Sequence, residues 1–100
     1  SLSEKILDDW LFSRNISHQI NFPYPGKRKL TVDFKVGDYW IELFGLTGQL
    51  KKYDQLKQEK LKISKKYQLK LIPIYLSDIF FPDKLDSKLN TILQNRLKPI

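Results

Sequence analysis

The chain has 100 residues, 41% of them hydrophobic, which is enough for one domain with a modest core. No apolar run reaches transmembrane length, and the absence of cysteine excludes disulfide scaffolds, thiol catalysis and cysteine-based zinc sites. The formal net charge of +7 favours a polyanionic partner such as nucleic acid, although a Lys-rich coding bias explains the same charge without a partner. With no secretory signal pattern either, we expect an intracellular protein of the cytoplasm, nucleoid or nucleus, neither secreted nor membrane-bound.

The first half of the chain predicts a helix followed by three strands. Residues 3–15 carry an apolar stripe at helical spacing, and residues 16–22 form a candidate first strand. Residues 23–29 then predict a turn that ends in three basic residues, Lys27, Arg28 and Lys29. Residues 30–36 and 39–44 are rich in β-branched and aromatic side chains and predict a hairpin about Gly37 and Asp38.

The second half predicts a helix, a strand and a closing helix. Glycines at 45 and 48 break the third strand, and a long helix runs from about residue 49 to residue 67. Residues 69–76 form a nearly continuous apolar strand, in which Pro73 indicates that one side lacks a ladder partner. Leucines and isoleucines at helical spacing from Leu85 to Leu97 predict one amphipathic helix. We therefore expect an α/β fold with a mixed sheet, in one domain over residues 1–100.

Two acidic residues face each other in the predicted hairpin. A two-residue turn at Gly37 and Asp38 sets a register in which Asp33 lies opposite Glu42, with Cβ atoms about 5 Å apart on one face. Opposed carboxylates repel unless a cation lies between them, and their oxygens suit a hard ion such as Mg²⁺. A solvent-facing strand pair is the alternative explanation, but Trp40 and Phe44 flank Glu42 on its own face.

A lysine on the long helix is the second unusual feature. Lys60 falls near the centre of the stripe formed by Tyr53, Leu56 and Ile63, which is rare for lysine unless it is paired or snorkels. A carboxylate site on the adjoining sheet would supply the pairing. Glu4 lies at the rim of the buried face of the first helix, where it can turn to the same site or simply stabilise the helix N-terminus.

These residues, in their order, resemble the PD-(D/E)XK nuclease superfamily. The likeness is to its small endonuclease domains of the very-short-patch-repair, Holliday-junction resolvase and homing endonuclease types, and it covers roughly residues 3–78. Glu4, Asp33 and Glu42 occupy the acidic positions of the superfamily pattern. The strand that contains Glu42 is followed by a helix that carries tyrosines and lysines. The resemblance implies a restriction-endonuclease-like αβββαβ core with a C-terminal helix.

The sequence departs from the superfamily pattern at two positions. Val32 stands where a proline normally precedes the first aspartate, and Phe44 replaces the usual lysine two residues after the second acid. Some members of the superfamily move this lysine to the following helix, so Lys60 is our candidate for the migrated residue. Further candidates for that role are Lys57, Gln49 and Lys35; Gln49 with Tyr53 also matches a Q-x-x-x-Y element of recombination-type nucleases.

The resemblance implies metal-assisted hydrolysis of phosphodiester bonds, with DNA as the expected partner. Asp33, Glu42 and the Leu43 carbonyl would hold Mg²⁺ or Mn²⁺, with Lys60 at the phosphate and Glu4 near the metal's water ligands. Phosphate backbone contacts would come from Lys27, Arg28, Lys29, Lys35 and Lys57. The chain is near the minimum length for this fold, so a homodimer or fusion to further domains stays open.

Two other classes of protein are compatible with the same residues. A catalytically inactive nuclease-fold module that binds nucleic acid is supported by Phe44 in the lysine position. A protein-interaction domain with a lysine-rich surface needs no nucleic acid at all. Salt-dependent binding to nucleic acid separates the second class from the others, because phosphate-driven binding weakens as salt rises.

Overall fold

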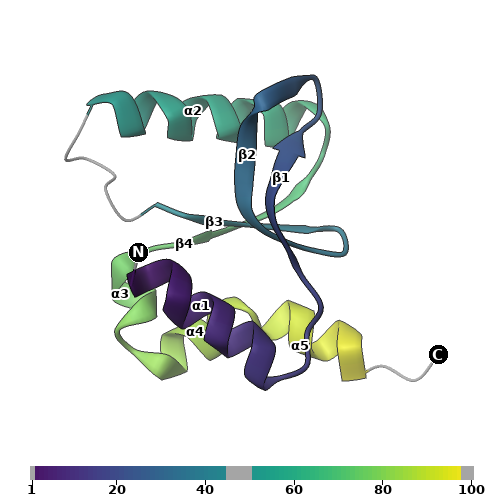
Figure 1. The fold of residues 1–100 in the computed structure, drawn as a ribbon, viewed down its shortest axis with the longest axis vertical. Coiled ribbons are helices and arrows are strands. Elements are labelled where there is room, and N and C mark those ends of the chain that lie inside the picture. The colour runs from purple at the N-terminus through teal and green to yellow at the C-terminus, as the bar shows by residue number, and fades with distance from the viewer. Residues whose placement is uncertain (1, 45–50, 98–100) are drawn as a thin grey trace.

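The computed structural model describes residues 2–44 and 51–97, which form a four-stranded sheet with helices on both faces (Figure 1). The fold is α/β with a mixed sheet, as the sequence predicts. The elements in chain order are α1 (Leu2–Ser13), β1 (Gln19–Tyr24), β2 (Lys27–Val36), β3 (Tyr39–Leu43), α2 (Lys51–Lys66), β4 (Lys70–Ile74), α3 (Leu76–Ile79), α4 (Pro82–Lys88) and α5 (Asn90–Leu97).

The strands lie in the order β1-β2-β3-β4, with the first three antiparallel and β4 parallel to β3. A parallel pair needs a crossover connection, and α2 occupies it. Because β4 is an edge strand, it can carry Pro73, which cannot donate a ladder hydrogen bond. The prediction that one side of this strand lacks a partner is confirmed.

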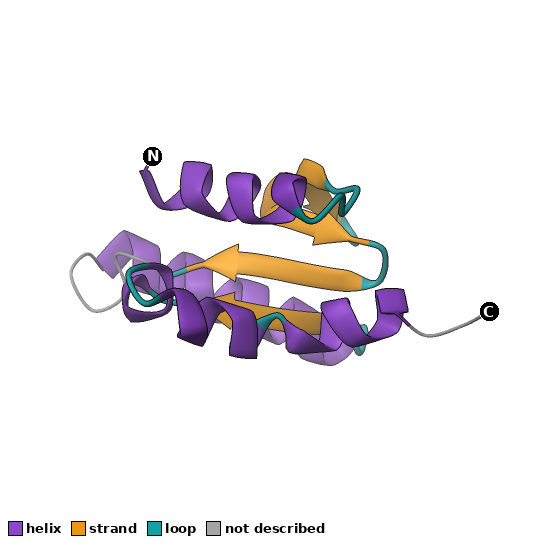
Figure 2. Ribbon diagram, turned by 90° about the horizontal axis from the view of Figure 1, so that it is seen from below, coloured by secondary structure: helices purple, strands orange, loops and turns teal. Residues whose placement is uncertain are grey.

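Two apolar clusters hold the helices against opposite faces of the sheet. One face packs against α1 and the C-terminal helices, which lie alongside each other in Figure 2. The other face packs against α2, where Trp40 contacts the rings of Phe22 and Tyr24 and Ile63 completes the cluster. None of the described helices is both long and apolar enough to cross a membrane.

The hairpin has the predicted register, but it becomes irregular at Asp33. Val36 pairs with Tyr39 and the ladder continues to Phe34 and Ile41, where the backbone pairing ends. On the other side, Asn21 lies in the left-handed region with φ 51° and interrupts the pairing of β1 with β2 opposite Asp33. Asp33 and Glu42 are adjacent, as the register predicts, but the backbone ladder ends one pair before them, and the Asp33 N–H bonds to the Glu42 side chain instead.

Several predicted boundaries are wrong. The basic triplet at residues 27–29 begins β2 and is not part of a turn, because the turn needs only Pro25 and Gly26, whose φ is 73°. The single closing helix expected from Leu85 to Leu97 is instead divided between α4 and α5, and a further short helix, α3, which the sequence does not predict, precedes them. Pro82 starts α4 at its first turn, and the chain leaves helical geometry at Leu89, with φ −100° and ψ 10°.

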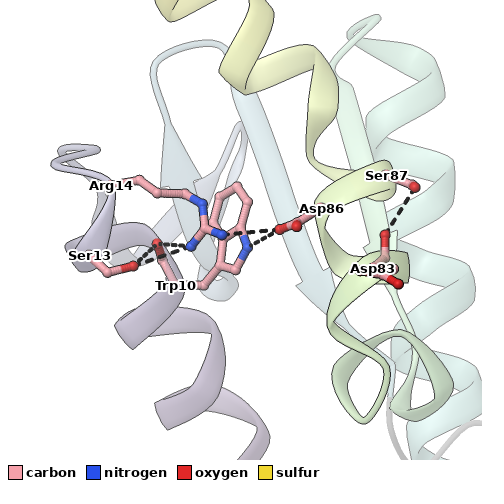
Figure 3. Close-up of polar contacts among 6 residues, drawn as sticks. All are labelled: Trp10, Ser13, Arg14, Asp83, Asp86 and Ser87. Carbon is pink, nitrogen blue, oxygen red and sulfur yellow. Dashed lines mark hydrogen bonds and ion pairs between the residues drawn. The ribbon is translucent and has the colours of Figure 1, made fainter.

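A polar contact fastens α1 to α4 across the helical layer (Figure 3). The Trp10 indole donates a hydrogen bond to Asp86 Oδ1 over 2.8 Å, and the Arg14 guanidinium lies 3.2 Å from the same oxygen. Arg14 also stacks over the Trp10 ring, 4.1 Å from its centroid. This contact fixes α1 along the sheet, and the N-terminal turn of α1 borders the cleft described below.

Candidate functional site

Asp33 and Glu42 hold each other through reciprocal hydrogen bonds at the irregular end of the hairpin. The Asp33 backbone N–H donates to Glu42 Oε1 over 2.8 Å, and the Leu43 backbone N–H donates to Asp33 Oδ2 over 2.8 Å. Each carboxylate thus satisfies a main-chain donor that the ladder leaves unpaired. The irregularity brings two acidic side chains together on adjacent strands and orients both of them.

Lys60 makes an ion pair with Glu42, as its position on the helix stripe predicts. Its Nζ atom lies 2.5 Å from Glu42 Oε2, and the Lys60 side chain is 16% exposed whereas that of Glu42 is fully buried. A buried ion pair of this kind must offset the cost of removing two charges from water. The snorkelling explanation is therefore insufficient for Lys60, whose ammonium contacts a buried carboxylate.

The environment of Glu42 still disfavours its ionised form. Burial, followed by the nearby Asp33 charge, raises the pKa of Glu42 from 4.5 to about 7, and Lys60 only partly opposes this shift. Burial is the larger cause, so the raised pKa mainly reflects the removal of Glu42 from water, and the Asp33 charge adds to the shift. A further cation beside the pair would favour the ionised form of Glu42 and oppose both contributions.

Two buried hydroxyl groups lie close to this site, and the sequence connects neither of them with Glu42; Tyr24 packs in the core, as expected for its turn. The hydroxyls of Tyr24 and Ser64 are buried close to the site, and neither makes a well-aligned hydrogen bond with any of the described residues. Burial and the Glu42 charge raise the pKa of Tyr24. The only sequence signal for Ser64 is its place one turn after Lys60, on the helix face that meets the sheet.

A cleft of about 490 Å³ opens beside this pair of carboxylates, between the ends of β3 and β4 and the side of α2. Its walls include Asp33, Leu43 and Lys60, while Glu42 is buried next to Asp33 and does not reach the cleft surface. Glu4, from the first turn of α1, also borders the cleft, so the acid that the sequence left ambiguous is on the side of the site.

Lys57 lies over the ring of Phe44. Its Nζ atom lies 5.2 Å from the ring centroids of both Phe44 and Tyr75, and all three residues line the cleft. Tyr53 lines the cleft too and is 46% exposed, so it is not part of the buried stripe that the sequence predicts. Tyr75 directly follows β4, and the parallel pairing of β4 with β3 places it at the same end of the sheet as Phe44.

Other predicted site residues lie away from the cleft or outside the described residues. The Lys35 ammonium donates to the Gly37 carbonyl over 2.6 Å, and Lys27 lies 3.6 Å from Glu59. Neither lysine, nor the exposed Lys29, lines the cleft. Arg28 is within β2, but its side chain lies outside what the structure describes, as does Gln49.

The carboxylate pair fits a hard divalent cation only in part. Its oxygens are the preferred ligands of Mg²⁺, and Leu43 at the cleft wall could add a carbonyl. However, no group of three or more His, Cys, Asp or Glu side chains suited to a metal occurs within residues 2–44 and 51–97. Glu42 Oε2 is also held by Lys60, so a cation could use it only after Lys60 moves.

No protein-family model, curated protein or solved structure matches this chain. The nuclease resemblance therefore depends on the residues and the fold order described above, and the function derived from it is a proposal.

Proposed function

We propose that the chain is a metal-dependent endonuclease domain that hydrolyses phosphodiester bonds, with DNA as its substrate. The observation that carries this proposal is the pairing of Asp33 and Glu42 on adjacent strands at a cleft whose opposite wall bears lysines from α2. Paired carboxylates with cationic groups facing them are what a phosphate and a divalent cation require together.

In this proposal, Lys60 leaves Glu42 and contacts the substrate phosphate when the metal ion and the substrate bind. Mg²⁺ or Mn²⁺ held by Asp33 and Glu42 would supply Lewis-acid chemistry for the hydrolysis. The Lys60 ammonium, released from Glu42 Oε2, would turn into the cleft that it already lines and contact the phosphate. Lys57, resting on Phe44, would hold a second phosphate oxygen or the adjacent phosphate.

The proposal is tested by cleavage of single-stranded, duplex, flapped and junction DNA with Mg²⁺ and with Mn²⁺. We expect metal-dependent cleavage of at least one substrate, and we expect Asp33→Asn to abolish it while keeping an acceptor for the Leu43 N–H. Metal should also raise the melting temperature of the wild type and leave that of Asp33→Asn unchanged, because ligands that bind the folded state stabilise it.

Asp9→Asn is the matched control, since Asp9 is an exposed acid paired with Lys5 on α1. It should behave as wild type in both measurements. Equal metal stabilisation of wild type and Asp33→Asn, together with no cleavage of any substrate, would contradict the site assignment.

A catalytically inactive module that binds nucleic acid is the second candidate. It is favoured by the engagement of Glu42 with Lys60 and by Phe44 in the lysine position. A wild-type protein that binds DNA in a salt-dependent way, with no cleavage in the whole panel, selects this candidate over the nuclease.

A further inference from the structure

We propose that an aromatic–lysine strip beside the cleft binds unpaired nucleotides, so that the preferred substrate has a single-stranded segment next to the bond to be cut. The strip consists of Phe44, Lys57, Tyr75, Lys88, Lys84 and Phe81. The statement about cleavage depends on the proposed nuclease function, whereas binding by the strip does not.

The inner end of the strip lies in the cleft. Lys57 Nζ is 5.2 Å from the centroids of both the Phe44 and the Tyr75 rings, which are themselves 6.1 Å apart. Phe44 and Leu43 are consecutive at the end of β3, and Leu43 binds the Asp33 side chain through its N–H. Because Phe44 is buried and Tyr75 is half-buried, Tyr75 is the ring that a base can reach at this end of the strip, close to the paired carboxylates.

The outer end continues along α4. Lys88 Nζ lies 5.4 Å from the Tyr75 ring, and Lys84, one helical turn earlier, lies 5.2 Å from the Phe81 ring. The strip thus runs from the cleft over Tyr75 and the two lysines of α4 to Phe81, which is 58% exposed and follows Phe80, itself 59% exposed. Two neighbouring phenylalanines in this position leave a large apolar surface open to solvent.

Charge favours a polyanion over a second copy of this chain as the occupant. Each chain has a formal net charge of +7, so two copies repel each other over a strip that already presents ammonium groups. Asp78 lies 3.8 Å from Lys88, and its negative charge partly offsets the attraction of Lys88 for a phosphate. We therefore expect Lys57 and Lys84 to attract phosphates more strongly than Lys88 does. A strand of nucleic acid supplies phosphates for the lysines and bases for the rings.

The rings require those bases to be unpaired. A base within a duplex has both faces covered by its neighbours, whereas an unstacked base can lie on an exposed aromatic ring. Such stacking tolerates any sequence, because every base has a π-face. The strip therefore predicts preference for single-stranded, flapped or branched substrates without predicting which sequence they carry.

The test is binding of a fluorescent oligothymidylate, its oligouridylate counterpart and a blunt duplex of equal length, all in EDTA so that no cleavage occurs. The variants are Phe81→Ala and, as the matched control, Phe12→Ala, since Phe12 is 77% exposed on α1 outside the strip. Lys84→Gln is compared with Lys65→Gln, an equal change of charge on the exposed side of the last turn of α2.

We expect the wild type to bind a single strand more tightly than the duplex. Phe81→Ala should weaken single-strand binding roughly fivefold or more and leave duplex binding nearly unchanged, as loss of one stacking platform does. Lys84→Gln should lower the salt slope on the single strand by about 0.7, and Lys65→Gln should not. Comparison of the oligothymidylate with the oligouridylate shows whether DNA or RNA supplies the unpaired bases.

Equal single-strand binding by Phe81→Ala and wild type would overturn the proposal, as would equal losses in Phe81→Ala and Phe12→Ala. Tighter binding to duplex than to single strand would also overturn it. A change in sedimentation behaviour of Phe81→Ala without a change in binding would assign the phenylalanines to a protein contact instead. The Asp9→Asn control should bind the single strand like wild type. Because binding is measured in EDTA, a failed cleavage assay does not decide this result.

Discussion

Glu42 is the residue whose surroundings constrain the site most strongly. It is fully buried, it accepts a hydrogen bond from the Asp33 backbone, and it contacts Lys60 through its other oxygen. Glutamine at this position removes the charge and keeps one oxygen that can accept the Asp33 N–H, but it replaces the oxygen that contacts Lys60 with an NH2 group. Substitutions that keep the amide or carbonyl oxygen are therefore more informative here than alanine.

The raised pKa of Glu42 predicts that stability falls as pH rises. Between its ordinary pKa of 4.5 and its folded value of about 7, the folded state holds a proton that the unfolded chain has lost. The free energy of unfolding therefore decreases with pH over this range, by a total on the order of 3 kcal/mol, and is level above it.

Urea denaturation in EDTA between about pH 5 and about pH 8 measures this slope. The neutral variant Glu42→Gln should lack the Glu42 part of the slope, so the difference between wild type and variant should grow as pH rises. A parallel pH dependence of the two proteins would contradict the assignment of the shift to Glu42.

The two cleft lysines predict different kinetic effects. If the proposed nuclease function is correct, Lys60→Met should lower turnover by a factor on the order of 100 or more with little change in binding, because the proposal gives Lys60 a preorganised contact to the transition state. Methionine keeps the apolar stem, so loss of packing is controlled for. Lys57→Met should weaken substrate binding more than it lowers turnover. If Lys60→Met instead has wild-type turnover and Lys57→Met has reduced turnover, the catalytic lysine is Lys57 and not Lys60.

At the scale of elements, the sequence is most informative where side-chain pattern and turn chemistry agree. The hairpin register follows from Gly37 at φ 55°, and the edge position of β4 follows from Pro73. The kink at Asn21 and Asp33 could not be read from the sequence, because an alternating strand pattern continues through it. The cleft aromatic Tyr75 and the hydroxyl of Ser64 were missed because only tertiary packing brings them to the hairpin.

The contact of α1 with α4 predicts a measurable loss of stability. Asp86→Ala leaves the buried Trp10 indole N–H without its acceptor and frees Arg14, so the free energy of unfolding should fall by about 1–3 kcal/mol. Asp86→Asn keeps a carbonyl oxygen and should lose less. Asp9→Ala, which breaks an exposed pair with Lys5, should be nearly neutral, and equal losses in Asp86→Ala and Asp9→Ala would refute the importance of this contact.

At the scale of the whole molecule, the lysine excess predicts the salt dependence of duplex binding. Neutralising Lys27, Arg28 and Lys29 together should weaken binding to all duplex sequences alike and reduce the log–log salt slope by about 0.9 for each phosphate that the variant no longer neutralises. Because Lys27 pairs with Glu59, its share of that reduction should be the smaller one. An unchanged salt slope, measured by fluorescence anisotropy, would show that this end of β2 is not part of the binding surface.

The outer edge of β4 has a consequence for how copies of the chain can meet. Pro73 has no N–H to donate at this edge, and its carbonyl already accepts a hydrogen bond from Lys88 Nζ over 3.4 Å. Pro73 therefore offers neither a donor nor an acceptor to a strand of another molecule. The same residue neighbours Glu42 in the β3–β4 ladder, beside the carboxylates. Extension of the sheet into a neighbouring molecule through this edge is therefore disfavoured, so copies of the chain are not expected to join β4 to β4 beside the cleft.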